Sequence, residues 1–428
     1  MSFYIKKNSN IPLIFSTFLF FIYIYPLYFN SIPLSSRIIY AILGICTIIY
    51  GRYIKLSLLY PLKGLIPIFA VSLLTGIINR TYDFYFAKYC VSVLMFFFAS
   101  FFVYNILNYI YKRNEVLNID FLIKLFIAIV TLQSVISILM FLIPGFTETL
   151  YTIFSVPESE EATLEENIGM RLIGLGSYFF AAGVIHGLSL IFTVYLYLKN
   201  EIKKRWVIIY VFNFFVGLLM ARTTVIGFAI SILFLIVWKP LNIFYIKQKI
   251  KWGIYFTIIF IIALIGIIMV VDEEVLKWAF EFFYNYSDTG SFESSSTNRL
   301  KEMYVIPTDF FTYIIGDGKY NLSEGGYYMS TDVGYLRLLY YGGIPMIMSF
   351  YFFMYYMIKY IIRYNASIVD KYLFFIIFLY LIILNFKGLA DINSVLTIIY
   401  IFSYFNYYQT LKFVDNNHGR SIYNNTSI

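Results

Sequence analysis

Long apolar runs recur from one end of this sequence to the other. Each run has about 16–25 residues, which is enough for a helix to cross the hydrocarbon core of a bilayer. The chain is 61% hydrophobic and 13% charged, whereas soluble globular proteins are about 45–50% apolar and about 25% charged. The sequence therefore predicts an all-α polytopic integral membrane protein with about 12 transmembrane helices.

The runs define one membrane domain, 1–414, followed by a polar tail, 415–428, for which we expect no regular structure. Long loops are predicted at about 144–172 and about 272–331, and the second precedes the tenth helix. Acidic residues open the second loop and apolar residues follow, which predicts an amphipathic helix lying along the membrane interface. A second short helix is expected to start near Ser296 or Thr297 and to end before Pro307. The predicted spans are about 11–30, 36–51, 61–79, 84–110, 119–143, 173–198, 206–221, 223–238, 253–271, 333–361, 371–386 and 392–410.

The distribution of charge between the runs predicts the orientation. With the N-terminus in the cytoplasm, the inner loops contain about 21 of the 32 lysine and arginine residues. About 19 of the 24 acidic residues then face outward. An even number of spans places both termini in the cytoplasm and both long loops on the outer side.

Several classes of function are disfavoured by what the sequence lacks. The net charge of +8 comes from short basic clusters between apolar runs, which does not suit nucleic-acid binding. Cys46 and Cys90 lie inside apolar runs and suggest neither a disulfide framework nor a metal site. No phosphate-binding loop, dinucleotide fingerprint or metal-ligand spacing is present. We therefore expect no ATP-driven transport, no metal and no cofactor.

Four basic residues oppose the positive-inside trend, because they fall at the predicted outer rim. Arginine offers phosphate a rigid fork of donors, so several cations at one rim suggest a site for a phosphate-bearing lipid. The alternative is that each cation pairs with one of the many outer carboxylates. The four residues are Arg171, Arg222, Arg299 and Lys387.

Three carboxylates lie near the outer ends of spans, namely Glu324, Asp332 and Asp391. A carboxylate there could act as general base for a sugar hydroxyl. The alternative is helix capping, for which Asp332 is well placed immediately before an apolar run. His186 is a lone histidine within the predicted sixth span, where it suits either a functional or a packing role.

The outer segments resemble the O-antigen polymerase (Wzy) family and its sister, the O-antigen ligase (WaaL) family. The similarity covers about residues 170–345, and the topology covers the whole chain. Four features carry the resemblance. A helix opens with a small residue, Arg and Ser/Thr in the string MARTTVIGFAISI, and the long loop has an Arg followed by an aliphatic-Gly-x-Gly turn in SSTNRLKEMYVIPTDFFTYIIGDGKY. A late helix has a small-residue break in STDVGYLRLLYYGGIPMIM, and an Arg-x-x-Gly segment precedes the sixth span in MRLIGLGSYFFAAG.

This resemblance implies a membrane glycosyltransferase that moves a growing glycan from undecaprenyl pyrophosphate onto a new lipid-linked repeat, without metal or nucleotide. It also implies a bacterial inner membrane, catalysis on the periplasmic face, and a flippase and a chain-length regulator as partners. Arg222 and Arg299 would hold the pyrophosphate, with Arg171 assisting and Lys387 at the same rim. Asp332 or Glu324 would activate the acceptor hydroxyl.

The sequence departs from the family patterns at two places. Thr331 occupies the position of the histidine in the ligase pattern, which favours a polymerase. The glycine expected after Arg171 is one place late, at Gly183, and none follows Arg299 at the expected spacing. A ligase and a lipid-linked oligosaccharide flippase remain as alternatives, although a flippase should carry charges along a central cavity between pseudo-symmetric halves.

Overall fold

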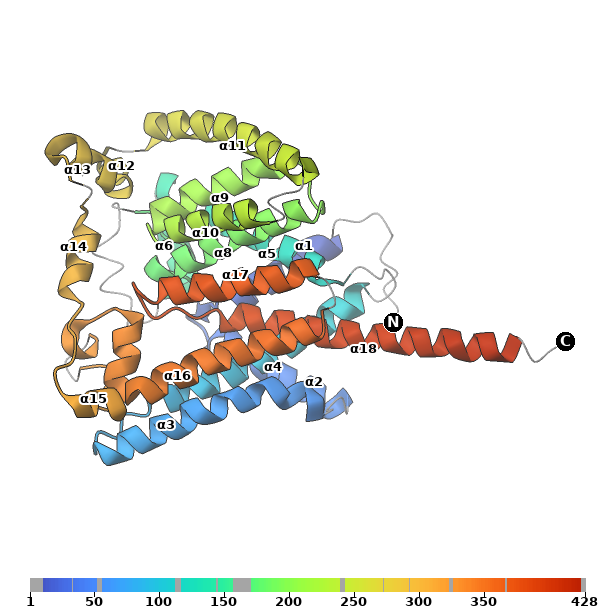
Figure 1. The fold of residues 1–428 in the computed structure, drawn as a ribbon. Helices are drawn as coiled ribbons and strands as arrows, with labels where there is room; N and C mark the ends of the chain where they lie inside the picture. The colour runs from blue at the N-terminus through green and yellow to red at the C-terminus, as the bar shows by residue number, and fades with distance from the viewer. Residues whose placement is uncertain are drawn as a thin grey trace.

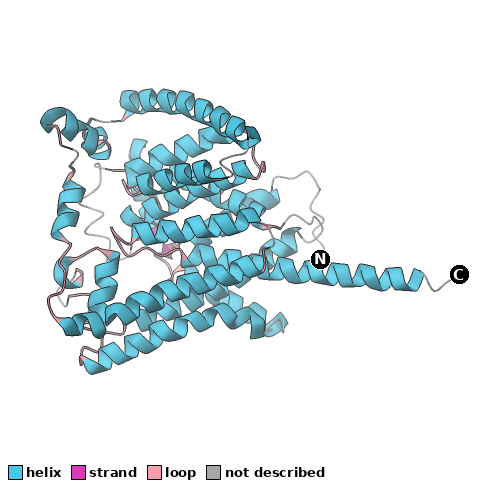
Figure 2. Ribbon diagram, in the orientation of Figure 1, coloured by secondary structure: helices cyan, strands magenta, loops and turns pink. Residues whose placement is uncertain are grey.

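In the computed structural model, most of the described chain is helical, as Figure 2 shows. The described residues are 11–32, 34–51, 56–111, 117–143, 145–156, 171–238, 243–271, 273–291, 293–322, 326–365 and 368–424.

A helix occupies the region of every predicted span, and most helices run roughly along one common direction (Figure 1). Within the described ranges, six helical segments are long and apolar enough to cross a membrane, and four shorter apolar helices accompany them. The chain is therefore an all-α protein with the apolar helices of a multi-pass membrane protein, whereas the number of twelve spans stays a prediction. The helices are α1 (Ile11–Ile24), α2 (Ser36–Gly51), η1 (Leu56–Gly64), α3 (Leu65–Ile78), α4 (Tyr85–Tyr111), α5 (Ile119–Leu142), α8 (Phe179–Leu198), α9 (Trp206–Met220), α10 (Thr224–Val237), α11 (Ile243–Val270), α16 (Gly334–Arg363), α17 (Ile368–Leu384) and α18 (Asn393–Asn424).

Loops that were predicted to share one side of the membrane lie together at one end of the helix bundle (Figure 1). At the predicted outer end, the Thr81 hydroxyl donates to the carbonyl of Gly318 at 2.6 Å. At the opposite end, the Asn406 amide donates to the carbonyl of Leu117 at 2.6 Å. These two contacts are compatible with the predicted grouping of loops, while the topology and the end that faces the cytoplasm stay predictions.

Short helices line the predicted outer end. The single amphipathic helix expected in the second long loop is instead two helices, because the backbone at Phe280 is not helical. Ser294 caps the next helix in a reciprocal capping box with Thr297, so that helix starts slightly before the predicted caps. The outer elements are α6 (Phe146–Ile153), α12 (Glu273–Ala279), α13 (Glu281–Thr289), α14 (Ser295–Glu302), α15 (Phe310–Ile314) and η2 (Tyr328–Ser330).

Several boundaries differ from the sequence prediction, and α11, for example, begins at Ile243 rather than near 253. The helix α8 begins at Phe179 rather than near 173, since Gly176 takes a positive φ of 68° that a helix cannot contain. The first span ends at Ile24, and β1 (Tyr28–Phe29) then pairs antiparallel with β2 (Phe154–Ser155). The expectation of an unstructured tail from 415 is wrong, because α18 continues as a helix to Asn424.

Glycine allows α8 and α10 to cross closely near the predicted outer end. A methyl group on Gly227 of α10 would lie 2.1 Å from the Cα atom of Gly187 in α8, which is impossible without moving a helix. A methyl group on Gly183, one turn earlier in α8, would contact Ala221 and Thr223 at 3.0 Å. Small residues let membrane helices approach until their backbones touch. This packing fixes the ends of α8 and α10, where the candidate site lies.

The small-residue break predicted in the late helix is present in α16. Gly342 and Gly343 leave the helical conformation, which frees two backbone carbonyl groups. The turn after α15 satisfies them, since the Asp317 amide donates to Tyr340 at 2.6 Å and the Gly318 amide donates to Tyr341 at 3.1 Å. The loop motif and the helix break are therefore two halves of one packing interaction.

We expect Gly343→Ala to destabilise this interaction strongly. Gly343 has φ 68° and ψ −165°, a conformation that costs other residues about 1–3 kcal/mol. The new methyl group would also lie 2.7 Å from the Tyr313 carbonyl oxygen. Thermal unfolding of the purified full chain in detergent measures the effect. Gly290→Ala is the matched control, because Gly290 has φ 73° and open space around it. Equal losses of thermal stability in the two variants would contradict the packing of the loop after α15 against the break in α16.

Candidate functional site

Two of the predicted arginines lie on one aromatic ring at the outer end of the bundle. The guanidinium carbon of Arg222 is 4.7 Å from the centre of the Trp278 ring, and that of Arg171 is 5.3 Å from it. Arg171 also lies 4.4 Å from the Phe179 ring. Aromatic faces attract cations, so Trp278 of α12 holds two like charges close together. Together with Lys387, these two arginines form what we call the cation cluster.

The ends of α9 and α10 position the two arginines. Arg222 occupies the tight turn between these helices, after the Ala221 amide closes α9 by donating to Gly217. Arg171 begins an extended segment, in which the Leu172 amide donates to the Leu219 carbonyl at 3.1 Å. The segment packs against α5, and a methyl group at Gly174 would lie 2.0 Å from the Gln133 side-chain nitrogen and would have to displace it.

Arg222 is paired, as the alternative interpretation of the outer cations anticipated. Its Nη1 atom lies 2.5 Å from a carboxylate oxygen of Glu281 and 3.2 Å from the Ser296 hydroxyl. Glu281 also accepts hydrogen bonds from the Ser295 amide and hydroxyl. Although burial raises the pKa of Glu281, these hydrogen bonds and Arg222 hold it below its usual value. The Nε atom of Arg222 is buried and has no partner in the described chain, so the guanidinium keeps a donor for a ligand.

Lys387 completes the cluster from the loop between α17 and α18. The Asn385 side chain braces this loop by bonding to both the amide and the carbonyl of Ala390. Burial, together with the charges of Arg222 and Arg171, lowers the pKa of Lys387 to about 8, while the charge of Asp332 opposes them. The loop therefore places the ammonium group within electrostatic range of both arginines.

The cluster carries more positive than negative charge. Burial lowers the pKa of Arg171 to about 10, and the charge of Arg222 contributes to that shift. Three cations thus face the two carboxylates of Glu281 and Asp332 in a partly buried place. Mutual repulsion between buried cations makes such a site favourable for an anion, which would relieve the repulsion.

The remaining predicted site residues have different outcomes. Asp332 does not cap α16, because Val333 is the N-cap residue, so the capping interpretation is wrong. The Thr331 hydroxyl accepts a hydrogen bond from the Val333 amide and donates one to the Met303 carbonyl at 2.8 Å. Arg299 is exposed on α14 and forms no ion pair with the described residues, so the structure does not bring it into the cluster. Glu324 lies outside the described residues.

Sequence reasoning missed the two side chains that organise the cluster. Trp278 and Glu281 were assigned to an amphipathic interfacial helix, and no spacing signal links them to Arg222. His186 has a packing role, since its Nδ1 atom bonds to the Ala182 carbonyl and its Nε2 atom lies 3.1 Å from the Ser134 hydroxyl. Only the fold of the outer loop could reveal that α12 and α13 cover the arginines.

No protein-family model, curated protein or solved structure gives a significant match to this chain. The resemblance to the polymerase and ligase families therefore depends on the four sequence motifs.

We predict that anion binding weakens as the pH rises through about 8, the pKa of Lys387. Below that pH the amine is already charged, whereas above it the amine must gain a proton before it can bind an anion. Titration of the purified protein with inorganic pyrophosphate across this range measures the effect. Lys387→Arg should retain pyrophosphate binding at high pH. Titration of pyrophosphate itself affects the wild type and this variant equally, so the difference between them reports on Lys387. Identical pH profiles would exclude Lys387 from the anion site.

Proposed function

We propose that this chain is a polysaccharide polymerase for O-antigen or capsule, acting at the periplasmic face of a bacterial inner membrane. It would transfer the growing glycan from undecaprenyl pyrophosphate onto a new lipid-linked repeat. The observation that supports this proposal most strongly is the cation cluster, in which Arg171 and Arg222 lie on the Trp278 ring and both arginines lower the pKa of Lys387.

The cluster suits the chemistry of a pyrophosphate leaving group. In the proposed reaction the acceptor hydroxyl attacks the anomeric carbon of the donor sugar, and the bond from that carbon to the pyrophosphate oxygen breaks. Negative charge then grows on the pyrophosphate, where fixed cations stabilise it. The unpartnered Nε atom of Arg222 and the ammonium group of Lys387 supply donors without a metal ion.

An apolar groove beside the cluster suits a lipid-linked substrate. The groove has a volume of about 230 Å³ and is lined by residues of α5, α9, α11 and α12. Leu172 in its wall directly follows Arg171, and Val275 lies one helical turn before Trp278. A substrate with phosphate at the arginines could therefore place the first part of a polyprenyl chain along this groove.

The other candidate residues take lesser or untested roles in this proposal. Arg299 lies one turn after Ser296, which contacts Arg222, so it is a candidate for the outer part of the pyrophosphate. Asp332 is a candidate for positioning the acceptor hydroxyl, because its carboxylate acts on Lys387 within the cluster. Glu324 is kept as a sequence-based candidate for the same role.

Two alternatives fit the chain less well. A ligase of the related family would need a histidine at position 331, where the Thr331 hydroxyl is instead bonded to the backbone. A flippase should have charged groups near the middle of its spans, whereas the cation cluster lies at the end of the bundle. We also expect a flippase and a chain-length regulator to act as partners in the same pathway.

Deletion of the gene in its native host tests the function. A polymerase predicts that the long-chain ladder of surface polysaccharide is lost while single repeats still reach the surface. Loss of every surface repeat, with lipid-linked polymer accumulating, would indicate a ligase. Accumulation of single repeats on the inner leaflet would indicate a flippase and would contradict the proposal.

A further inference from the structure

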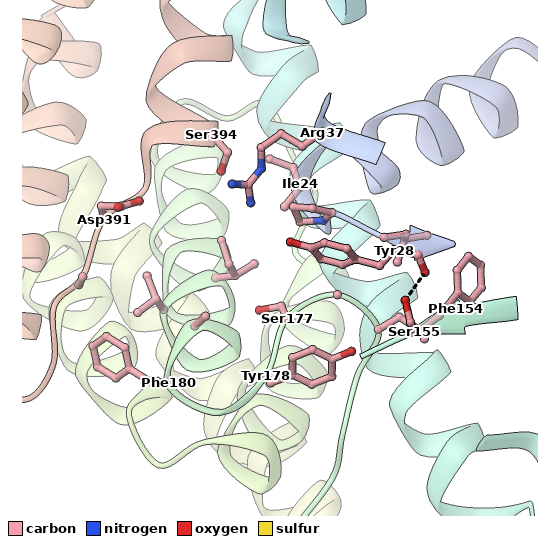
Figure 3. Close-up of a pocket in the computed structure, with 18 of the residues that line it drawn as sticks. Ile24, Tyr28, Arg37, Phe154, Ser155, Ser177, Tyr178, Phe180, Asp391 and Ser394 are labelled. Carbon is pink, nitrogen blue, oxygen red and sulfur yellow. Dashed lines mark hydrogen bonds between the residues drawn. The ribbon is translucent and has the colours of Figure 1, made fainter. Parts of the chain in front are cut away.

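A polar cavity, distinct from the apolar groove described above, lies next to the cation cluster but separate from it. Its volume is about 340 Å³, and its walls come from α1, α2, α8, the β1–β2 pair and the loop before α18. Figure 3 shows the Arg37 guanidinium and the Asp391 carboxylate directed toward this space from different elements. Arg37 was not a candidate at the level of sequence, whereas Asp391 was one of three carboxylates near span ends that could act as general base for a sugar hydroxyl, with helix capping as the alternative.

The polar groups of this cavity are only partly satisfied by the protein. Arg37 donates to the Ser92 hydroxyl at 3.1 Å and lies 4.1 Å from the Phe96 ring, but its buried Nε atom has no partner among the described residues. Ser177 is 8% exposed, and its hydroxyl likewise has no partner in the described part of the chain. Buried polar atoms without partners are costly, so this wall is suited to an incoming ligand with polar groups.

The mixture of charges selects among ligand classes. Arg37 and Asp391 attract one another electrostatically, but they form no direct ion pair. A phosphate would be drawn to Arg37 and repelled by Asp391, whereas sugar hydroxyl groups can accept from the guanidinium and donate to the carboxylate. The rings of Tyr28, Tyr178 and Phe180 in the wall offer apolar faces for a sugar ring. A volume near the lower end of the usual range of about 300–1,000 Å³ suits a saccharide unit rather than a long chain.

The cavity and the cation cluster share two segments of the chain. Phe179 lies against Arg171 in the cluster, and the next residue, Phe180, lines the cavity. Lys387 belongs to the cluster, and Asp391 in the same loop lines the cavity. A ligand in the cavity would therefore lie beside a pyrophosphate in the cluster, as a transfer between two substrates requires.

We propose that the cavity between Arg37 and Asp391 binds a sugar of the acceptor repeat. Asp391 accepts hydrogen bonds from sugar hydroxyl groups, and Arg37 and Ser177 donate to sugar oxygens. The assignment to the acceptor depends on the proposed polymerase function, whereas saccharide binding by the cavity does not.

The test uses purified full-length protein and, as probe, oligosaccharides released by mild acid from the surface polysaccharide of the native host. Saturation-transfer NMR and calorimetry measure binding. Asp391→Ala and Ser177→Ala should each weaken binding, the former by about tenfold or more because a hydrogen bond to a charged group is lost. Glu148→Gln, an exposed acid of α6, is the matched control. Arg222→Gln should bind the probe like wild type, since the probe has no pyrophosphate.

The outcomes separate the two proposals. Absence of binding by the wild type, binding equal to wild type in both cavity variants, or equal binding of an unrelated glucan would overturn the sugar site, whatever the deletion strain shows. Selective binding that depends on Asp391, together with an unchanged polysaccharide ladder in the deletion strain, would support the cavity and overturn the polymerase.

Discussion

Replacing Arg222 with glutamine should abolish the long-chain polysaccharide ladder in the complemented deletion strain. The Arg222 side chain is only 8% exposed, and it lies on Trp278. Loss of one fixed donor to a developing negative charge costs about 10²–10³-fold in rate. Arg222→Lys keeps the charge but loses the planar fork, so we expect an intermediate ladder of shorter chains.

The controls distinguish loss of chemistry from loss of folding. Arg80→Gln removes an exposed arginine at the same end of the bundle and should leave the ladder unchanged. Glu281→Gln removes the carboxylate paired with Arg222. If the role of Arg222 is to bind substrate and not merely to pair with Glu281, we expect this variant to stay active. The quantity of each variant in the membrane fraction must match wild type. A normal ladder from Arg222→Gln at normal abundance would contradict the proposed site.

Apolar length and glycine placement made the arrangement of helices predictable from the sequence. A run such as 119–143 can be little else than a buried or membrane helix, and α5 covers 119–142. The break in α16 was expected from the resemblance of STDVGYLRLLYYGGIPMIM to a helix with a small-residue break, and Gly342 and Gly343 do leave the helical conformation. These features depend on local chemistry, which a sequence displays directly.

The candidate site was predictable only in part, because it depends on contacts between distant segments. The positive-inside rule singled out Arg171, Arg222 and Lys387 as exceptions, and the fold brings all three together. It also singled out Arg299, which lies exposed on α14. No local signal indicated that Trp278 and Glu281 would cover the cluster. They follow Arg171 by 107 and 110 positions in the sequence.

The cavity shows the same limit more strongly. Arg37 lies in the first turn of the apolar helix α2, and in the sequence it resembles an ordinary charged residue beside a membrane span. Its importance appears only when the loop with Asp391, more than three hundred residues later, is seen to close the same space. Contacts of such long range are set by how the helices pack, which composition and periodicity do not specify.

Replacing Lys199 with methionine should destabilise the opposite end of the bundle by about 3–5 kcal/mol, the usual cost of removing one partner from a buried ion pair. The Lys199 ammonium lies 2.7 Å from a carboxylate oxygen of Asp120 and 3.6 Å from one of Asp370. Both carboxylates are 7% exposed, and the Tyr195 hydroxyl donates to each of them. Without the lysine, two buried negative charges from α5 and α17 would face each other around one hydroxyl.

A basic residue at this end has two possible roles, as a topology signal and as a packing partner, and two further variants separate them. Lys124→Met removes the same charge from the same end, but its ion pair with Glu201 is 34% and 40% exposed, so the expected loss is about 0–1 kcal/mol. Lys199→Met combined with Asp120→Asn removes one of the two carboxylates and should recover part of the lost stability. Thermal unfolding in detergent compares all three proteins. If the two single variants lose equal stability, or if the double variant recovers none, Lys199 acts through topology and the buried network has no special role.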